Sequence, residues 1–192
     1  PEEVARYRQL ADEFQLNLHM DGARFANAVV ASGVNPADIT WRAGVDCLSF
    51  GLTKNGGIAT EAVVMFNQAL AEDFAYRRKR AGHLWSKQRF LAAQWLALLE
   101  SDLWLDNARH ANAMARELAV GFAAHDAIRL PWPVDANELF PVIPGVLRGR
   151  LRDAGLVFYD WPQEADMTRF VTHFGTDPAE LARAVEVIAT CQ

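Results

Sequence analysis

The chain has 192 residues, of which 51% are hydrophobic and 22% are charged. These fractions are close to those of globular proteins, so a disordered chain, a collagen-like chain and a disulfide scaffold are excluded. The longest nearly apolar stretch, residues 90–99, is about half a membrane span and contains Gln94, so no membrane partner is expected. The sequence starts with no signal-peptide pattern, and its only cysteines, Cys47 and Cys191, form no CxxC pair. We therefore expect a cytoplasmic protein with free thiols.

The charges are distributed unevenly along the chain. The net charge is -5, yet residues 77–89 hold six basic side chains and no acidic one. A basic run of this kind is usually a solvated helix face or a nucleic-acid patch. The acidic remainder of the chain and the lack of interleaved surface aromatic residues argue against nucleic acid.

The first part of the chain alternates helices with strands. Helices are predicted at 1–14 and 23–31, and strands at 16–22, 45–50 and 62–66. This alternation is typical of an α/β layer with parallel strands. The link before the strand at 62–66 is too short for a helical crossover, so this strand is expected to pair antiparallel.

The second part has a different pattern. Residues 67–122 are mostly helical with a break near Ser101, and a proline-rich stretch follows at 130–133. The elements predicted after it are strands at 139–142, 156–159 and 169–174, a helix at 144–154, and a last helix capped by Asp177. A small α+β domain at 105–192 is therefore expected to follow an α/β domain at 1–104.

Two side chains point to chemistry at a sheet edge. Asp21 ends one predicted strand, and Lys54 follows another in the glycine-rich loop at 51–57. Ligands of open α/β sheets bind at this carboxyl edge. A partly desolvated lysine suits Schiff-base formation, and a neighbouring carboxylate can keep a pyridine nitrogen protonated. Each signal alone has an ordinary explanation, since Asp-Gly is commonly a turn and a loop lysine is usually solvated.

The sequences LHMDGARFANA at 18–28 and DCLSFGLTK at 46–54 together resemble the low-specificity threonine aldolases. These belong to the β-eliminating lyase group of fold-type-I enzymes, which depend on pyridoxal 5'-phosphate (PLP). The resemblance continues through 78–83 and 168–173. It implies that residues 1–104 are the C-terminal part of a PLP-binding large α/β domain with connecting helices, followed by the small α+β domain.

The resemblance also implies roles for three residues near the cofactor. Lys54 is expected to form the Schiff base with PLP, and Asp21 to pair with the pyridine nitrogen. Arg24, three residues later, is expected to approach the phenolic oxygen of the cofactor. The alternative for Arg24 is a surface position on the helix at 23–31.

Three more basic residues receive roles by resemblance. Arg169 is expected to hold the α-carboxylate of the substrate, for which its planar fork is suited. The alternative for Arg169 is a simple bridge to an acidic residue. The basic segment matches one that reaches the active site of a neighbouring subunit, with Lys79 contacting substrate and Lys87 contacting the cofactor phosphate. No metal is expected, because the five histidines show no ligand spacing.

The implied function is a carbon–carbon lyase. It cleaves β-hydroxy-α-amino acids such as threonine or allo-threonine to glycine and an aldehyde, in a homo-oligomer (dimer or tetramer) with shared active sites. One alternative is another PLP-dependent amino-acid lyase that catalyses β-elimination. The other is a catalytically incomplete fragment whose helices at 67–122 serve only in assembly.

Only 20 residues precede Asp21. Members of the family carry a ring-stacking histidine, a phosphate-binding loop and a proton-transfer histidine before the Asp-Gly motif. We therefore expect the chain to be the C-terminal part of a longer enzyme.

Overall fold

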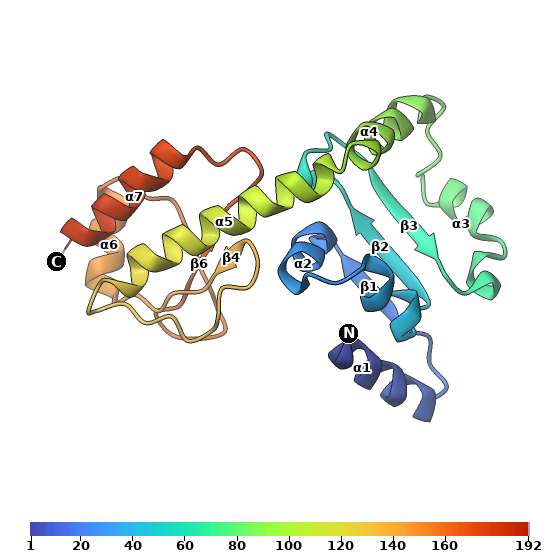
Figure 1. The fold of residues 1–192 in the computed structure, drawn as a ribbon, viewed down its shortest axis with the longest axis horizontal. Coiled ribbons are helices and arrows are strands. Elements are labelled where there is room, and N and C mark those ends of the chain that lie inside the picture. Colours follow the sequence, from blue (N-terminus) through green and yellow to red (C-terminus); the bar gives the residue numbers. More distant parts are fainter. Residues whose placement is uncertain (192) are drawn as a thin grey trace. The chain divides into compact units, whose positions relative to one another are not determined.

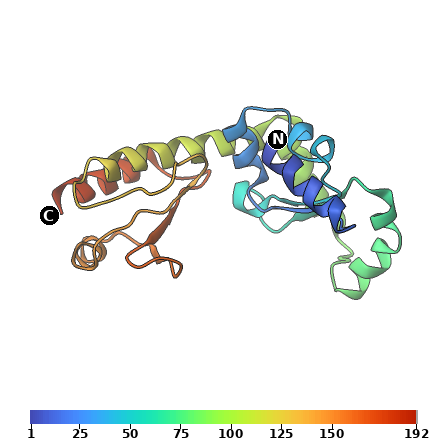
Figure 2. The same cartoon turned by 90° about the horizontal axis from the view of Figure 1, so that it is seen from below.

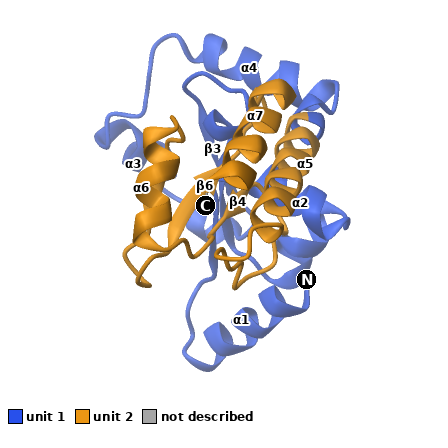
Figure 3. Ribbon diagram, turned by 90° about the vertical axis from the view of Figure 1, so that its left-hand side faces the viewer, with its two compact units in different colours: residues 1–106 blue, residues 107–192 orange. Residues whose placement is uncertain are grey.

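The computed structural model describes residues 1–191. Two compact units make up the chain: unit 1 is Pro1–Asp106, and unit 2 begins at Asn107 (Figure 3). The boundary predicted from the sequence, after residue 104, lies two residues before this division. No helix in the described part of the chain is long and apolar enough to cross a membrane.

Unit 1 is an α/β layer built on a three-stranded sheet with the order β1-β2-β3 (Figure 1). Its strands are β1 (His19–Gly22), β2 (Cys47–Gly51) and β3 (Glu61–Met65). Its helices are α1 (Glu2–Glu13), α2 (Phe25–Ser32), α3 (Phe74–Arg80) and α4 (Gln88–Glu100), and short 3₁₀ turns include η1 (Pro36–Ile39) and η3 (Thr53–Asn55). β1 and β2 are parallel and β3 is antiparallel to β2, which confirms the pairing predicted from the short link.

One face of this sheet is covered by aromatic side chains. The Phe50 ring of β2 lies 5.2 Å from that of Phe25 in α2, 4.8 Å from Trp95 in α4 and 5.5 Å from Trp104. Leu48, which points the same way as Phe50 in β2, is buried. Ser49 lies between Leu48 and Phe50 in β2 and therefore faces the other side of the sheet, because side chains alternate along a strand. Asp21 of β1 is paired with Ser49, so it belongs to that opposite face as well.

Unit 2 is a small α+β layer. Its helices are α5 (Leu103–Ala123, which begins in unit 1), α6 (Gly145–Asp153) and α7 (Pro178–Thr190), and its strands are β4 (Glu138–Leu139), β5 (Tyr159–Asp160) and β6 (Thr168–Val171). The strands form an antiparallel sheet with the order β4-β6-β5. Helices α5 and α7 run side by side in Figures 1 and 2, and a Cβ added at Gly121 of α5 would lie 2.9 Å from Val185 of α7. Only a glycine permits this close helix packing.

Two strands start three residues later than the sequence predicts, and β2 starts two residues later, at Cys47. The strand expected at 16–22 begins at His19, because the Leu16 N–H still donates to the Ala11 carbonyl at the end of α1. The strand expected at 156–159 is β5 at Tyr159–Asp160. Here the Leu156 N–H donates to Leu151 after a left-handed Gly155, so these residues end α6 instead of pairing with a strand.

A carboxylate network ties the amino ends of β1 and β2 to the carboxyl end of the antiparallel β3. Asp46, which directly precedes β2, accepts hydrogen bonds from the Leu18 N–H (2.8 Å), the Arg8 guanidinium (2.8 Å) and the Asn67 amide (3.1 Å). Its side chain is 17% exposed. Burial acts to raise the pKa of Asp46, but the hydrogen bonds from Leu18 and Asn67 and the charge of Arg8 outweigh it and hold the pKa below the ordinary 3.8.

We expect Asp46→Asn to lower the free energy of unfolding by about 1–3 kcal/mol at neutral pH, because the partly buried Arg8 guanidinium loses the less exposed of its two carboxylate partners, Asp46 and Asp12. Since the folded-state pKa is lowered, this stabilisation is complete above the unfolded-state pKa of about 3.9 and is lost as the pH falls through the folded-state value. Urea unfolding of both proteins between neutral and acidic pH should show the difference shrinking in acid.

Asp38→Asn is the matched control, because Asp38 pairs with Arg42 at 2.9 Å with both side chains largely exposed. Its effect should stay within about 0.5 kcal/mol. An Asp46 variant that behaves like this control would contradict the role given to the network.

Candidate active site

Asp21 lies at the carboxyl end of β1, in a tight turn. Its Oδ1 atom accepts a hydrogen bond from the Ala23 N–H at 3.0 Å, and its side chain is exposed. In the parallel pairing of β1 and β2, Asp21 lies opposite Ser49. The Oγ atom of Ser49 is 2.9 Å from Nε2 of His19, the residue two positions before Asp21 on the same face. The turn expected from Asp-Gly is therefore present, and it leaves the carboxylate accessible to a ligand.

Lys54 lies in the 3₁₀ turn η3 that follows β2. The next residue, Asn55, is buried, and its side-chain amide donates to the Trp104 carbonyl at 2.7 Å. Lys54 itself is exposed, so the partial desolvation expected from the sequence is wrong for this chain. The turn directs Asn55 inward and leaves its neighbour at the surface.

A second carboxylate holds the Lys54 turn to the sheet. Glu61, the first residue of β3, is paired with Gly51 and accepts hydrogen bonds from the Leu52 N–H at 2.9 Å and the Thr53 N–H at 3.3 Å. It also accepts one from the Thr53 hydroxyl. Sequence reasoning missed Glu61. The antiparallel pairing predicted across this loop was the available signal, because it places the start of the next strand beside the lysine turn.

The loops that carry Asp21 and Lys54 touch each other. A Cβ atom at Gly51 would lie 2.7 Å from both the Cα and the carbonyl oxygen of Ala23, which is backbone that cannot rotate away. Gly51 therefore allows the turn after β1 to pack directly on the end of β2. Arg24 follows Ala23 immediately and is half-buried at the start of α2. The structure thus brings the segments of Asp21, Arg24 and Lys54 to one edge of the unit 1 sheet.

The basic segment contributes side chains elsewhere in unit 1. Lys79 lies on α3 and Lys87 directly precedes α4, and both are exposed. Among residues 1–191, no hydrogen bond or ion pair joins either of them to Asp21 or Lys54. A cavity of about 790 Å³ lies between β3, α3 and α4. Its polar lining residues include Thr53, Glu61, Arg77, Arg78, His83 and Gln88, but neither of these lysines.

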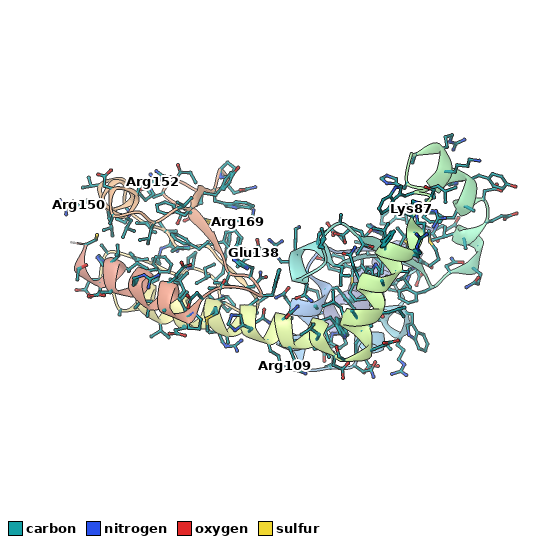
Figure 4. The ribbon with its side chains drawn as sticks, turned by 90° about the horizontal axis from the view of Figure 1, so that it is seen from above. Lys87, Arg109, Glu138, Arg150, Arg152 and Arg169 are labelled. Carbon is teal, nitrogen blue, oxygen red and sulfur yellow. The ribbon has the colours of Figure 1, made fainter. Side chains whose placement is uncertain are left out.

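Arg169 belongs to β6 of unit 2 and is paired with an acidic residue. Its Nε and Nη2 atoms lie 2.8 Å and 2.7 Å from the Oε1 atom of Glu138 (Figure 4). Its guanidinium carbon is 5.5 Å from the centre of the Trp161 ring. The bridge to an acidic residue considered for Arg169 therefore exists. Such a bridge does not exclude ligand binding, because a guanidinium has five N–H donors.

No group of three histidine, cysteine, aspartate or glutamate side chains within residues 1–191 is arranged to hold a metal ion. The accessible groups at the sheet edge are instead a primary amine and a carboxylate. They suit a ligand that combines a carbonyl group with a basic nitrogen.

This chain belongs to the β-eliminating lyase family, whose model matches residues 1–143. It is 44% identical to a low-specificity L-threonine aldolase of Pseudomonas aeruginosa over 191 residues, which are 98% of this chain and 55% of that protein. The threonine aldolase structure of Leishmania major matches with a TM-score of 0.87 at 30% identity, over 98% of this chain and 55% of that one. The chain therefore spans about half the length of these relatives.

These comparisons confirm the family resemblance and the α/β fold class drawn from the motifs. The fold alone is shared more widely. A sphingosine-1-phosphate lyase of Burkholderia pseudomallei matches with a TM-score of 0.70 at 19% identity, over 98% of this chain and 48% of that one.

We expect Gly51→Ala to lower the free energy of unfolding by about 1–3 kcal/mol, because the added methyl group meets the Ala23 backbone. Urea unfolding at neutral pH measures the change. Gly149→Ala on α6 is the control, since its Cβ would meet nothing within 4 Å. That control should be neutral or stabilising. If Gly51→Ala unfolds like the wild type, the two loops are not held in contact.

Proposed function

We propose that the complete protein is a PLP-dependent aldolase that cleaves β-hydroxy-α-amino acids, such as threonine and allo-threonine, to glycine and an aldehyde. The observation that carries the proposal is the packed sheet edge, where the Gly51–Ala23 contact joins the loops of Asp21 and Lys54. The 44% identity to a threonine aldolase over 98% of this chain supports the substrate class.

The residues of this edge fit PLP. The exposed Lys54 offers the primary amine that binds the aldehyde of the cofactor, and the exposed Asp21 offers a carboxylate for the pyridine nitrogen. Arg24, at the start of α2, is the proposed partner of the phenolic oxygen. Lys87, which does not belong to this edge, is the proposed partner of the phosphate in the site of a neighbouring subunit. When bound, the cofactor supplies an electron sink for the electron pair that remains when the Cα–Cβ bond breaks.

The chain's own residues have separable tasks in this proposal. Asp21 keeps a proton on the ring nitrogen, because an anionic carboxylate favours the protonated form of its partner. Arg169 binds the α-carboxylate of the substrate with its planar fork. Lys79 supplies a further cation for the substrate, from a helix whose last turn is entirely basic.

We further propose a cytoplasmic homo-oligomer, a dimer or tetramer, with active sites shared between subunits. Cys47 and Cys191 are both free thiols, which suits a reducing compartment. The basic side chains of α3 are exposed and form no ion pair among residues 1–191, so they are available to a second subunit.

We expect Asp21→Ala to slow aldehyde release by several orders of magnitude while the protein stays folded, because a neutral pyridine is a poor electron sink. The assay supplies the intact gene product with PLP and threonine or allo-threonine and measures aldehyde and glycine. Glu13→Ala removes an exposed carboxylate at the end of α1 and should leave the rate unchanged.

Near-normal turnover by Asp21→Ala would refute the role of this carboxylate. Release of ammonia and pyruvate in place of aldehyde would assign β-elimination instead. If the intact product with PLP acts on no amino acid, the chain has only an assembly role.

A further inference from the structure

The Arg169–Glu138 pair has a geometry that goes beyond a simple bridge between strands. A single oxygen, Oε1 of Glu138, accepts from both Nε and Nη2, which together form one edge of the guanidinium plane. Bidentate carboxylate binding needs two parallel N–H groups on one edge. The edge formed by Nη1 and Nη2 therefore remains for a second carboxylate.

The register of β4 and β6 brings Glu138 and Arg169 together. Glu138 of β4 lies opposite Val171 of β6, so Arg169, two residues before Val171, is its diagonal neighbour on the same face. The Trp161 ring, just after β5, lies 5.5 Å from the guanidinium carbon. An arginine side chain has many rotamers, and this one is restrained by an anion on one edge and an aromatic ring nearby.

The pair is also only partly shielded from solvent. The side chains of Arg169 and Glu138 are 28% and 26% exposed, so a small ligand can reach the guanidinium. The Arg129–Glu164 pair in the same unit has a similar distance, 2.8 Å, but its side chains are 60% and 42% exposed. Within residues 1–191, Arg129 contacts Glu164 through Nη2 alone, so one edge of its guanidinium is not held as in Arg169.

We propose that Glu138 is a positioning residue, which holds the Nε edge of Arg169 so that its Nη1 edge faces the carboxylate of an amino-acid ligand. This inference rests on the proposed function, since it assigns the α-carboxylate of the substrate to Arg169. Two consequences follow for binding. Removing the Glu138 oxygen leaves the Arg169 guanidinium free to rotate. Replacing it with a neutral oxygen keeps the guanidinium oriented toward the ligand.

The test measures the Kd of glycine by calorimetry, and the KM and kcat for threonine, on the intact gene product with PLP. Glu138→Ala should raise Kd and KM by about tenfold and change kcat by less than about twofold, because only ligand binding is affected. Glu138→Gln keeps an acceptor oxygen and should bring Kd back to within about threefold of the wild type. Glu164→Ala is the matched control and should change neither constant.

Glu138→Asp covers the case in which the alanine variant does not fold. It keeps the charge but withdraws the oxygen by one methylene group, so Kd should still rise by about threefold or more. An Asp variant with the wild-type Kd, or a Gln variant as weak as the alanine variant, would overturn the proposal. So would wild-type protein that binds no glycine, or Arg169→Gln protein that binds it normally.

Failure of the proposed function gives a different result. If the wild type releases no aldehyde, yet binds glycine with the dependence on Glu138 described above, the positioning role of Glu138 is supported and the proposed aldolase activity is refuted.

Discussion

The contact between the backbone at Ala23 and the Cα of Gly51 is the constraint on which the candidate site depends. Parallel strands alone bring two carboxyl ends to one edge, but they do not fix the loops that follow. In this chain Gly51 lets the turn of Asp21 pack against the end of the strand that leads to Lys54, since a Cβ added at Gly51 would lie only 2.7 Å from the Ala23 backbone. Three further restraints, from Glu61, Asn55 and the β2–β3 pairing, fix the lysine turn itself.

Much of this arrangement could be predicted from the sequence. The Asp-Gly turn, the lysine after a buried strand and the short link to an antiparallel strand are local patterns, and each is present in the structure. The family was predicted from two motifs, one carrying the acid at the end of β1 and the other carrying the amine just after β2, and the match over residues 1–143 confirms it. Patterns within a few residues are sufficient for such predictions.

The supporting residues could not be predicted in this way. Glu61 acts through a contact across a loop, and Asp46 through a network that joins α1, the residue before β1 and Asn67, which lies two residues after β3. Glu138 meets Arg169 only because of the β4–β6 register, 31 residues apart in sequence. The exposure of Lys54 also differs from expectation, because burial depends on everything that packs around a loop.

The central claim is that the amine of Lys54 binds PLP covalently, and mapping the attachment site tests it most directly. The intact gene product is incubated with PLP, reduced with borohydride, digested and examined by mass spectrometry. We predict the reduced cofactor on the peptide that contains Lys54, and none at that peptide in Lys54→Arg protein. Label found on another lysine, such as Lys79 or Lys87, with Lys54 unmodified, would contradict the account.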